Sequence, residues 1–190
     1  NLEKMHVMVE QACKGLAGVS ASQVEIQSGI QFYDGISTAE IQEILIRSAS
    51  DLIDLDHPNY QFVAARLLLF ALRKNLFGRI HELPNLKDHV VDCVNKRIYD
   101  SEILNSYSDE EFVKLQGFID HDRDYLFTYA GLRQVVDKYL VQDRSSDKLY
   151  ETPQFMYLLI SATIFSKYPK DARLDYVKRY YDAISKHKIN

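Results

Sequence analysis

The start of one expected helix combines side chains that suit anion binding. In "DGISTAEI", Ser37 precedes an apolar helical stripe and Glu40 follows three residues later, which is the spacing of a capping box. Thr38 adds a second hydroxyl where a helix exposes unpaired N–H groups and about half a positive charge. Because anions bind readily at such ends, Thr38 is either a phosphate ligand or a tolerated first-turn residue.

Lys74 is a cation that could accompany such an anion. It ends the run "LRK" in an apolar helix expected from Pro58 to Gly78. A cation there favours the negative end of the helix dipole. The alternative is that Lys74 binds an anion beside the helix start that Ser37 caps, and the local sequence leaves both interpretations open.

The run "DHDRD", Asp120–Asp124, carries carboxylates at the spacing of the first calcium ligands of an EF-hand. That loop also needs Gly at its sixth position and Glu at its twelfth. Those positions hold Tyr125 and Gly131, so the EF-hand is excluded. We interpret the run as a polar turn entering a helix, with Arg123 paired locally; a role in a larger assembly is the alternative.

Other catalytic and metal-binding patterns are missing from the sequence. The six His residues show no HxxxH or HExxH spacing, and there is no nucleophile elbow, Walker loop or GxGxxG. Cys13 and Cys93 have no CxxC partner, which favours unreactive thiols in a reducing compartment. We therefore expect no metal site and no self-contained catalytic centre.

The composition of the 190 residues is typical of a globular protein. Hydrophobic residues make up 46% and charged residues 26%, and the net charge is −4. This acidic balance argues against a general nucleic-acid binder, including a helix-turn-helix protein. No apolar run approaches the roughly 18 residues of a membrane span, so we expect neither nucleic acid nor a membrane as a partner.

Apolar spacing predicts a mainly α fold. Only 7 Gly and 4 Pro interrupt the chain. The expected helices lie at residues 2–16, 22–30, 38–53, 58–78, 86–99, 109–119, 125–139, 154–167 and 171–186. The expected caps are Asn1, Ser37, Asn85 and Ser108, the last paired with Glu111. One small β-hairpin is expected near residues 140–151, around a polar turn at Ser145–Asp147.

Five segments resemble one family: "IQFYDGISTAEI", "AARLLLFALRK", "FIDHDRDYLFTYA", "KYLVQDR" and "RLDYVKRYYDAIS". In order, and along essentially the whole chain, they are similar to the large (alpha) subunit of bacterial class Ia ribonucleotide reductase. The resemblance implies an ATP-cone, a four-helix cluster with a β-hairpin cover, at residues 1–78. Residues 79–190 then look like the helical region that precedes the ten-stranded catalytic α/β barrel.

The resemblance also implies a function. In that family the ATP-cone is the allosteric activity domain, where ATP activates and dATP inhibits. The parent enzyme is an oxidoreductase that reduces ribonucleoside diphosphates for DNA synthesis, with a radical supplied by its small (beta) subunit. Its catalytic residues lie in the barrel, so no catalytic residue or cofactor is expected here. The family implies a cytoplasmic homodimer that forms larger regulated complexes.

Site residues carry over position by position from the family. Thr38 looks like the threonine near the nucleotide phosphates, and Lys74 looks like the lysine that contacts them. Gln42 stands where relatives carry His, and Gln11 where some carry Trp, two departures that argue against a second nucleotide. The remaining matches, on the base and ribose side and in the pocket, are Asn1, Lys4, Met5 and Phe70.

The family hairpin, with its "KRDG"-type basic residues, would precede residue 1. We therefore expect this chain alone to bind dATP weakly or not at all. The competing hypothesis is an all-α protein-interaction module with no nucleotide function in this form. The polar, Tyr-rich helix faces would suit such a module.

Overall fold

The structure, a computed structural model, describes residues 2–189 and the side chains of residues 3–189. The chain folds into two compact units. Unit 1 contains the residues up to Asn75 together with Tyr125–Lys138, and unit 2 contains Leu76–Asp124 together with the residues from Tyr139 onward. The expected domain division at residue 78 concerns family domains and stays a prediction. The packing adds that a later segment, Tyr125–Lys138, joins the N-terminal unit.

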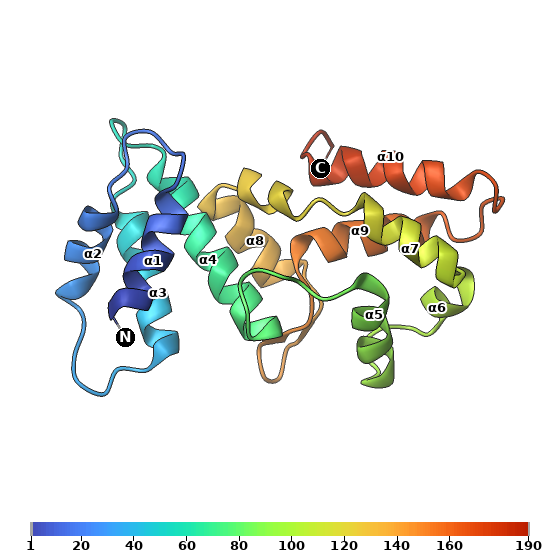
Figure 1. Ribbon diagram of the computed structural model, residues 1–190, viewed down its shortest axis with the longest axis horizontal. Coiled ribbons are helices and arrows are strands. Elements are labelled where there is room, and N and C mark those ends of the chain that lie inside the picture. Colours follow the sequence, from blue (N-terminus) through green and yellow to red (C-terminus); the bar gives the residue numbers. More distant parts are fainter. Residues whose placement is uncertain (1, 190) are drawn as a thin grey trace. The chain divides into compact units, whose positions relative to one another are not determined.

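Unit 1 is a cluster of helices in which α4 is the most buried element. Its helices are α1 (Leu2–Cys13), α2 (Ala21–Gly29), α3 (Thr38–Asp51), the greater part of α4 (Tyr60–Phe77) and α8 (Tyr129–Lys138). Apolar side chains surround nearly the whole circumference of α4, and Leu69 and Phe70 are fully buried. Figure 1 shows that α4 runs antiparallel to α1 and α3.

The first turns of α4 hold the α1–α2 connection by hydrogen bonds. The Tyr60 hydroxyl accepts from the Ser20 N–H (3.0 Å) and donates to Gln23 Oε1 (2.6 Å). Arg66 Nη1 donates to the Ala12 and Lys14 carbonyl oxygens, at 3.0 and 2.7 Å. Arg66 therefore places a cation at the C-terminal end of α1, where the helix dipole is negative.

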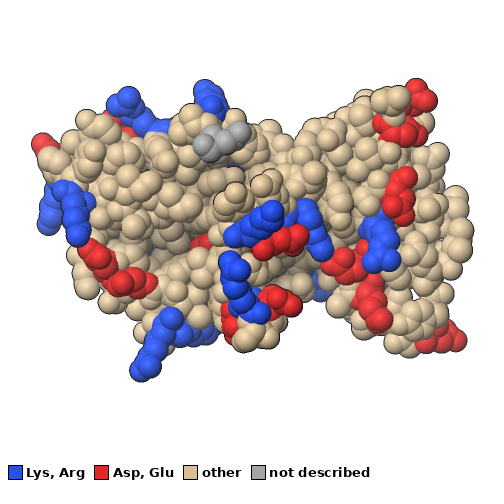
Figure 2. All heavy atoms as spheres, turned by 180° about the vertical axis from the view of Figure 1, so that it is seen from behind, with Lys and Arg blue, Asp and Glu red and all other residues tan. Residues whose placement is uncertain are grey.

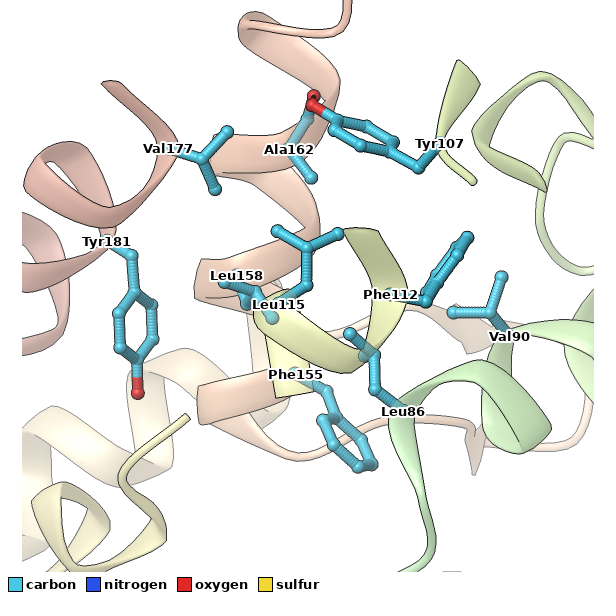
Figure 3. Close-up of a cluster of buried hydrophobic side chains, with 10 residues drawn as sticks. All are labelled: Leu86, Val90, Tyr107, Phe112, Leu115, Phe155, Leu158, Ala162, Val177 and Tyr181. Carbon is cyan, nitrogen blue, oxygen red and sulfur yellow. Dashed lines mark hydrogen bonds between the residues drawn. The ribbon is translucent and has the colours of Figure 1, made fainter. Parts of the chain in front are cut away.

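Unit 2 is organised around the antiparallel pair α9 (Pro153–Ile164) and α10 (Arg173–Ser185). The other elements are α5 (Leu86–Asn95), α6 (Glu102–Ser106), α7 (Asp109–Phe118), most of the short 3-10 helix η1 (His121–Leu126), β1 (Gln142–Asp143) and β2 (Lys148–Leu149). Figure 3 shows the core between them, in which Phe155, Leu158 and Ala162 of α9 face side chains of α5, α7 and α10.

The mainly α fold and most helix starts are confirmed. Both capping boxes form, at Ser37 with Glu40 and at Ser108 with Glu111. Asn85 caps α5 by accepting from the Lys87 N–H at 2.9 Å. The hairpin is also confirmed, with the antiparallel register Gln142 to Leu149 and Asp143 to Lys148.

Several helix boundaries were wrong. α1 ends at Cys13, before the expected end at residue 16, and α9 ends at Ile164, not at residue 167. α8 begins only at Tyr129, because the preceding residues form η1. Both α6 and η1 were missed, since helices this short carry too few apolar repeats to show a period.

The "DHDRD" run is more than a helix-entry turn. Arg123 does pair locally, with Nε 3.2 Å from Asp120 Oδ2. It also reaches α10, where Nη1 lies 2.8 Å from Asp182 Oδ1 and 2.7 Å from Ser185 Oγ. Asp124 is buried and accepts a hydrogen bond from Gln154 Nε2 at 2.9 Å. The run therefore ties distant parts of unit 2 together.

Among the helices between residues 2 and 189, none combines the length and the apolar character that crossing a bilayer requires.

Candidate functional site

The N-terminus of α3 has a complete cap. Ser37 Oγ accepts from the Glu40 N–H (3.2 Å), and Glu40 Oε2 accepts from the Ser37 N–H (2.9 Å). The Tyr33 hydroxyl donates to the other Glu40 oxygen at 2.9 Å. The hydrogen bonds from Ser37, and then that from Tyr33, lower the pKa of Glu40. Capping therefore needs only Ser37 and Glu40, with Tyr33 in support.

Thr38 takes no part in this cap. Its side chain is exposed, and its hydroxyl makes no hydrogen bond to any residue between 2 and 189. A helix leaves its first N–H groups without partners inside the helix, and here the cap side chain serves only the Glu40 N–H. Thr38 therefore offers a free hydroxyl beside helix-end donors, the combination that binds phosphate oxygens.

Gln42 lies one turn after Thr38 on the same side of α3. Its side chain is only 6% exposed, and its Nε2 is buried with no hydrogen-bond partner among the described residues. An unsatisfied buried donor costs roughly 1–3 kcal/mol. A ligand that supplied an acceptor at this position would remove that cost.

Lys74 and Phe70 come from α4, one turn apart. Lys74 is exposed. Phe70 is fully buried and meets the Tyr125 ring edge-on, with the ring centroids 6.4 Å apart. Phe70 thus serves the core of unit 1 in this structure, and a contact between its ring and a nucleotide stays a prediction.

The remaining expected site residues belong to α1. Lys4 is exposed and Met5 is half-buried. Asn1 lies outside the described residues. Figure 1 shows that the N-terminal ends of α1 and α3 lie at the same end of the cluster. Lys4 belongs to the first turn of α1, Thr38 begins α3, and Lys74 lies in the last turn of α4.

Charge is mixed on the face of the molecule drawn in Figure 2. There, Lys and Arg side chains are interspersed with Asp and Glu, and neither sign forms a continuous stripe. On that face, an anion would therefore depend on local donors and not on an extended basic surface.

Metal and thiol chemistry find no support in the part of the chain that is described. No three His, Cys, Asp or Glu residues within it are grouped to hold a metal ion. Cys13 and Cys93 are free thiols. Burial raises the pKa of Cys93 to about 11, so this thiol stays protonated and unreactive at neutral pH.

Sequence reasoning missed one residue of the α3 end. Tyr33 lies in the turn before the helix, seven residues ahead of the carboxylate that it contacts. No local pattern predicts that contact, because it depends on how the turn around Gly35 folds back. Gly35 has a φ of +87°, a conformation that favours glycine.

Two parts of the chain match known domain families. Residues 1–75 match the ATP cone domain, and residues 125–190 match the all-alpha domain of ribonucleotide reductase. The chain therefore combines the features of an ATP cone with those of a reductase all-alpha domain.

Individual relatives match along the whole chain. All 190 residues align, at 51% identity, with ribonucleoside-diphosphate reductase 1 subunit alpha of Escherichia coli K12, and at 52% with the subunit alpha of Haemophilus influenzae. The subunit alpha of enterobacteria phage T4 is 42% identical over 91% of the chain. The chain covers 25% of the first two relatives and 23% of the third, so it spans about a quarter of their length. Over its whole length the chain is therefore similar to part of the ribonucleoside-diphosphate reductase alpha subunits.

Proposed function

We propose that this chain is the regulatory N-terminal region of a ribonucleoside-diphosphate reductase large subunit, whose cone binds ATP as activator and dATP as inhibitor. The observation that carries the proposal is the whole-length match to reductase alpha subunits, with an ATP cone at residues 1–75. The free donors at the start of α3 support it.

The nucleotide phosphates would lie at the N-terminus of α3. The Thr38 hydroxyl and the helix-end N–H groups donate to phosphate oxygens, and Lys74 supplies a counter-charge from the end of α4. The buried Gln42 Nε2 gains an acceptor. Lys4 and Met5, at the start of α1, face the base and ribose, together with Asn1.

Glu40 is the acidic group closest in sequence to this phosphate position. Both of its carboxylate oxygens already accept hydrogen bonds, one from Tyr33 and one from Ser37. These donors partly offset its negative charge and hold it in the cap. The capping box therefore stabilises α3 without occupying the donors that a phosphate needs.

Regulation would follow from differential binding. An effector shifts an equilibrium only if its affinity differs between the active and inhibited states. The cone would act by offering or withdrawing a contact surface for the small, radical-carrying subunit within larger cytoplasmic assemblies of the dimeric parent. Reduction of ribonucleoside diphosphates would be carried out by parts of the parent outside these 190 residues.

The test is calorimetric titration of dATP into the full-length large subunit with and without Lys74→Ala. Loss of a charged hydrogen bond should weaken binding by about 1–3 kcal/mol, or roughly 5- to 150-fold. Lys14→Ala is the matched control. It removes the same charge from an exposed position just after the C-terminal end of α1, whereas the proposed nucleotide contacts of α1 lie at its N-terminal end. Equal affinity of the Lys74→Ala variant and the unmodified protein would remove Lys74 from the site.

A further inference from the structure

Helix α9 is apolar on more sides than its neighbours in unit 2 cover. The segment from Pro153 to Ser166 contains no charged residue. A helix that is hydrophobic all round is typical of a position buried on every side. In this structure one side of α9 packs into the core, but Ile160 and Ile164 remain 42% and 50% exposed.

These exposed side chains border a cavity within unit 2. It has a volume of about 750 Å³ and opens to the surface. The α9 groove, as we call it, is lined by Ile98, Ile103, Tyr139, Ile160, Ile164 and Tyr168. Four of these six are exposed large apolar side chains. Such a concentration marks an interaction surface and not chance exposure.

The charged groups that line the α9 groove do not require a charged ligand. Glu151 lies there, buried, and its two oxygens accept from the Tyr99 hydroxyl (2.6 Å) and the Val141 N–H (2.9 Å). Burial raises the pKa of Glu151, and burial also raises that of Tyr99. At the rim, Lys167 pairs with Glu102 at 3.4 Å. These charged groups already have partners, so the groove favours an apolar occupant.

The geometry of α9 also indicates the shape of that occupant. Met156, Ile160 and Ile164 follow one another at intervals of four residues and form a single ridge along the helix. Ridges of this spacing pack into the grooves of a second helix. An uncharged ridge is typical of permanent interfaces, which resemble a domain core cut in two.

We infer that the α9 groove is the seat for an apolar helix from the remaining polypeptide of the same large subunit. This inference rests on the proposed function. The relatives are about four times as long as this chain, so most of their polypeptide is available as a tethered partner. A tether raises the effective concentration of the occupant, so the groove is filled without a high intrinsic affinity.

Hydroxyl-radical footprinting tests the inference without any substitution. Oxidation of Tyr139 and Tyr168, which are 60% and 44% exposed here, is compared between the 190-residue chain and the full-length subunit. We expect their oxidation rates to fall about fivefold or more in the full-length subunit, because packed interface cores exclude water. The reference is Tyr33, which is 58% exposed and belongs to unit 1, whereas the groove belongs to unit 2. Unchanged rates at Tyr139 and Tyr168, or an equal fall at Tyr33, would overturn the inference.

A double variant distinguishes between two occupants of the groove, a helix of the same subunit and a second copy of the chain. Ile160→Ser with Ile164→Ser should leave the melting temperature of the 190-residue chain unchanged but lower that of the full-length subunit. Val113→Ser, at an exposed apolar site on α7, is the control and should change neither. If instead the 190-residue chain sediments as a dimer that the double variant dissociates, the occupant is a second copy and the inference fails. Because dATP titration is read independently, loss of nucleotide binding would refute the proposed function and leave these groove results standing.

Discussion

Two buried glutamines, one in each unit, show how differently the two parts of the chain treat polar groups. Gln154 of α9 is fully buried, and both ends of its amide are hydrogen-bonded: Nε2 donates to Asp124, and Oε1 accepts from the Tyr181 hydroxyl at 2.7 Å. Gln42 of α3 is almost as buried, yet its Nε2 has no partner among the described residues.

This difference distinguishes a buried amide that stabilises the fold from one that could bind a ligand. A satisfied buried amide fixes the positions of its neighbours, so the interior of unit 2 around Gln154 is a scaffold. An unsatisfied amide costs free energy until something arrives to accept its proton. We propose that the α3 end of unit 1 is a ligand site, and the following predictions test that distinction.

The largest expected effect breaks the scaffold at Arg173. Its guanidinium donates to both oxygens of Glu111, at 2.8 and 2.6 Å, and lies 4.4 Å from the centre of the Tyr107 ring. Arg173→Met leaves the Glu111 carboxylate without its charged partner and should lower the free energy of unfolding by about 3–5 kcal/mol. Urea unfolding measures this change.

A matched control comes from the same helix. Arg179 pairs with Asp175 at 3.7 Å, and both side chains are exposed. Because exposed pairs contribute little, Arg179→Met should cost at most about 1 kcal/mol. Equal losses for the two variants would contradict the scaffold interpretation of unit 2.

The next effect is a pH dependence that originates in unit 2. His89 is buried against Phe155, with the rings stacked at 4.8 Å, and burial lowers its pKa to about 4. The unfolded chain takes up the proton near pH 6.5, but the folded chain does so only near pH 4. Stability is therefore lost as the pH falls from 6.5 to 4, by about 3 kcal/mol in total.

His89→Phe should flatten the stability profile between pH 6.5 and 4, as followed by urea unfolding at a series of pH values. His57→Phe, which replaces an exposed histidine paired with Asp54 at 3.1 Å, should leave the slope from His89 in place. A slope that survives in the His89→Phe variant would assign the acid loss to other groups.

The two glutamines themselves give the most direct comparison. Gln154→Leu removes the hydrogen bonds from Gln154 to the Asp124 carboxylate and from the Tyr181 hydroxyl to Gln154, both buried, and should cost about 2 kcal/mol. Gln42→Leu removes an unsatisfied donor, so it should leave stability unchanged or raise it by up to about 1 kcal/mol. Thermal and urea unfolding of the two variants measure both signs.

In the full-length subunit, Gln42→Leu should also weaken dATP binding, whereas Gln154→Leu should not. If both substitutions destabilised the protein equally, the contrast between scaffold and site would fail.

The smallest effect is a pH response of opposite sign in unit 1. His6 Nδ1 lies 2.6 Å from Glu25 Oε1, and Nε2 lies 3.4 Å from Glu10. The hydrogen bond with Glu25, more than the charge of Glu10, raises the pKa of His6. Its contribution is complete below pH 6.5 and is lost as the pH rises through the folded pKa. NMR titration should show this pKa falling towards its ordinary value in Glu25→Gln, while His89 keeps its own.

The sequence could predict what depends on neighbours along the chain. Ser37 with Glu40, and Ser108 with Glu111, lie three residues apart, so both capping boxes could be identified. The Arg173–Glu111 pair spans 62 residues, and no local pattern encodes such a partner. Glu111 therefore had a second role, binding Arg173, that the cap alone did not indicate.

The candidate site divides in the same way. Helix physics suggested an anion site at the start of α3, and the family resemblance singled out Thr38 and Lys74; both stay predictions. The unpaired state of the Gln42 amide depends on which side chains cover it after folding. The sequence alone could not predict that property, because most Gln side chains are exposed and bonded to water.

Arg66 gives α1 one fixed end. By holding the carbonyls of Ala12 and Lys14, it restrains the helix at its C-terminus. Nearer the other end of α1, His6 contacts Glu25 of α2, so neighbouring helices hold α1 near both ends. A nucleotide that bound Lys4 would therefore add its contact to a helix whose position is already coupled to α2 and α4, and a local binding event would act on several helices of unit 1 at once.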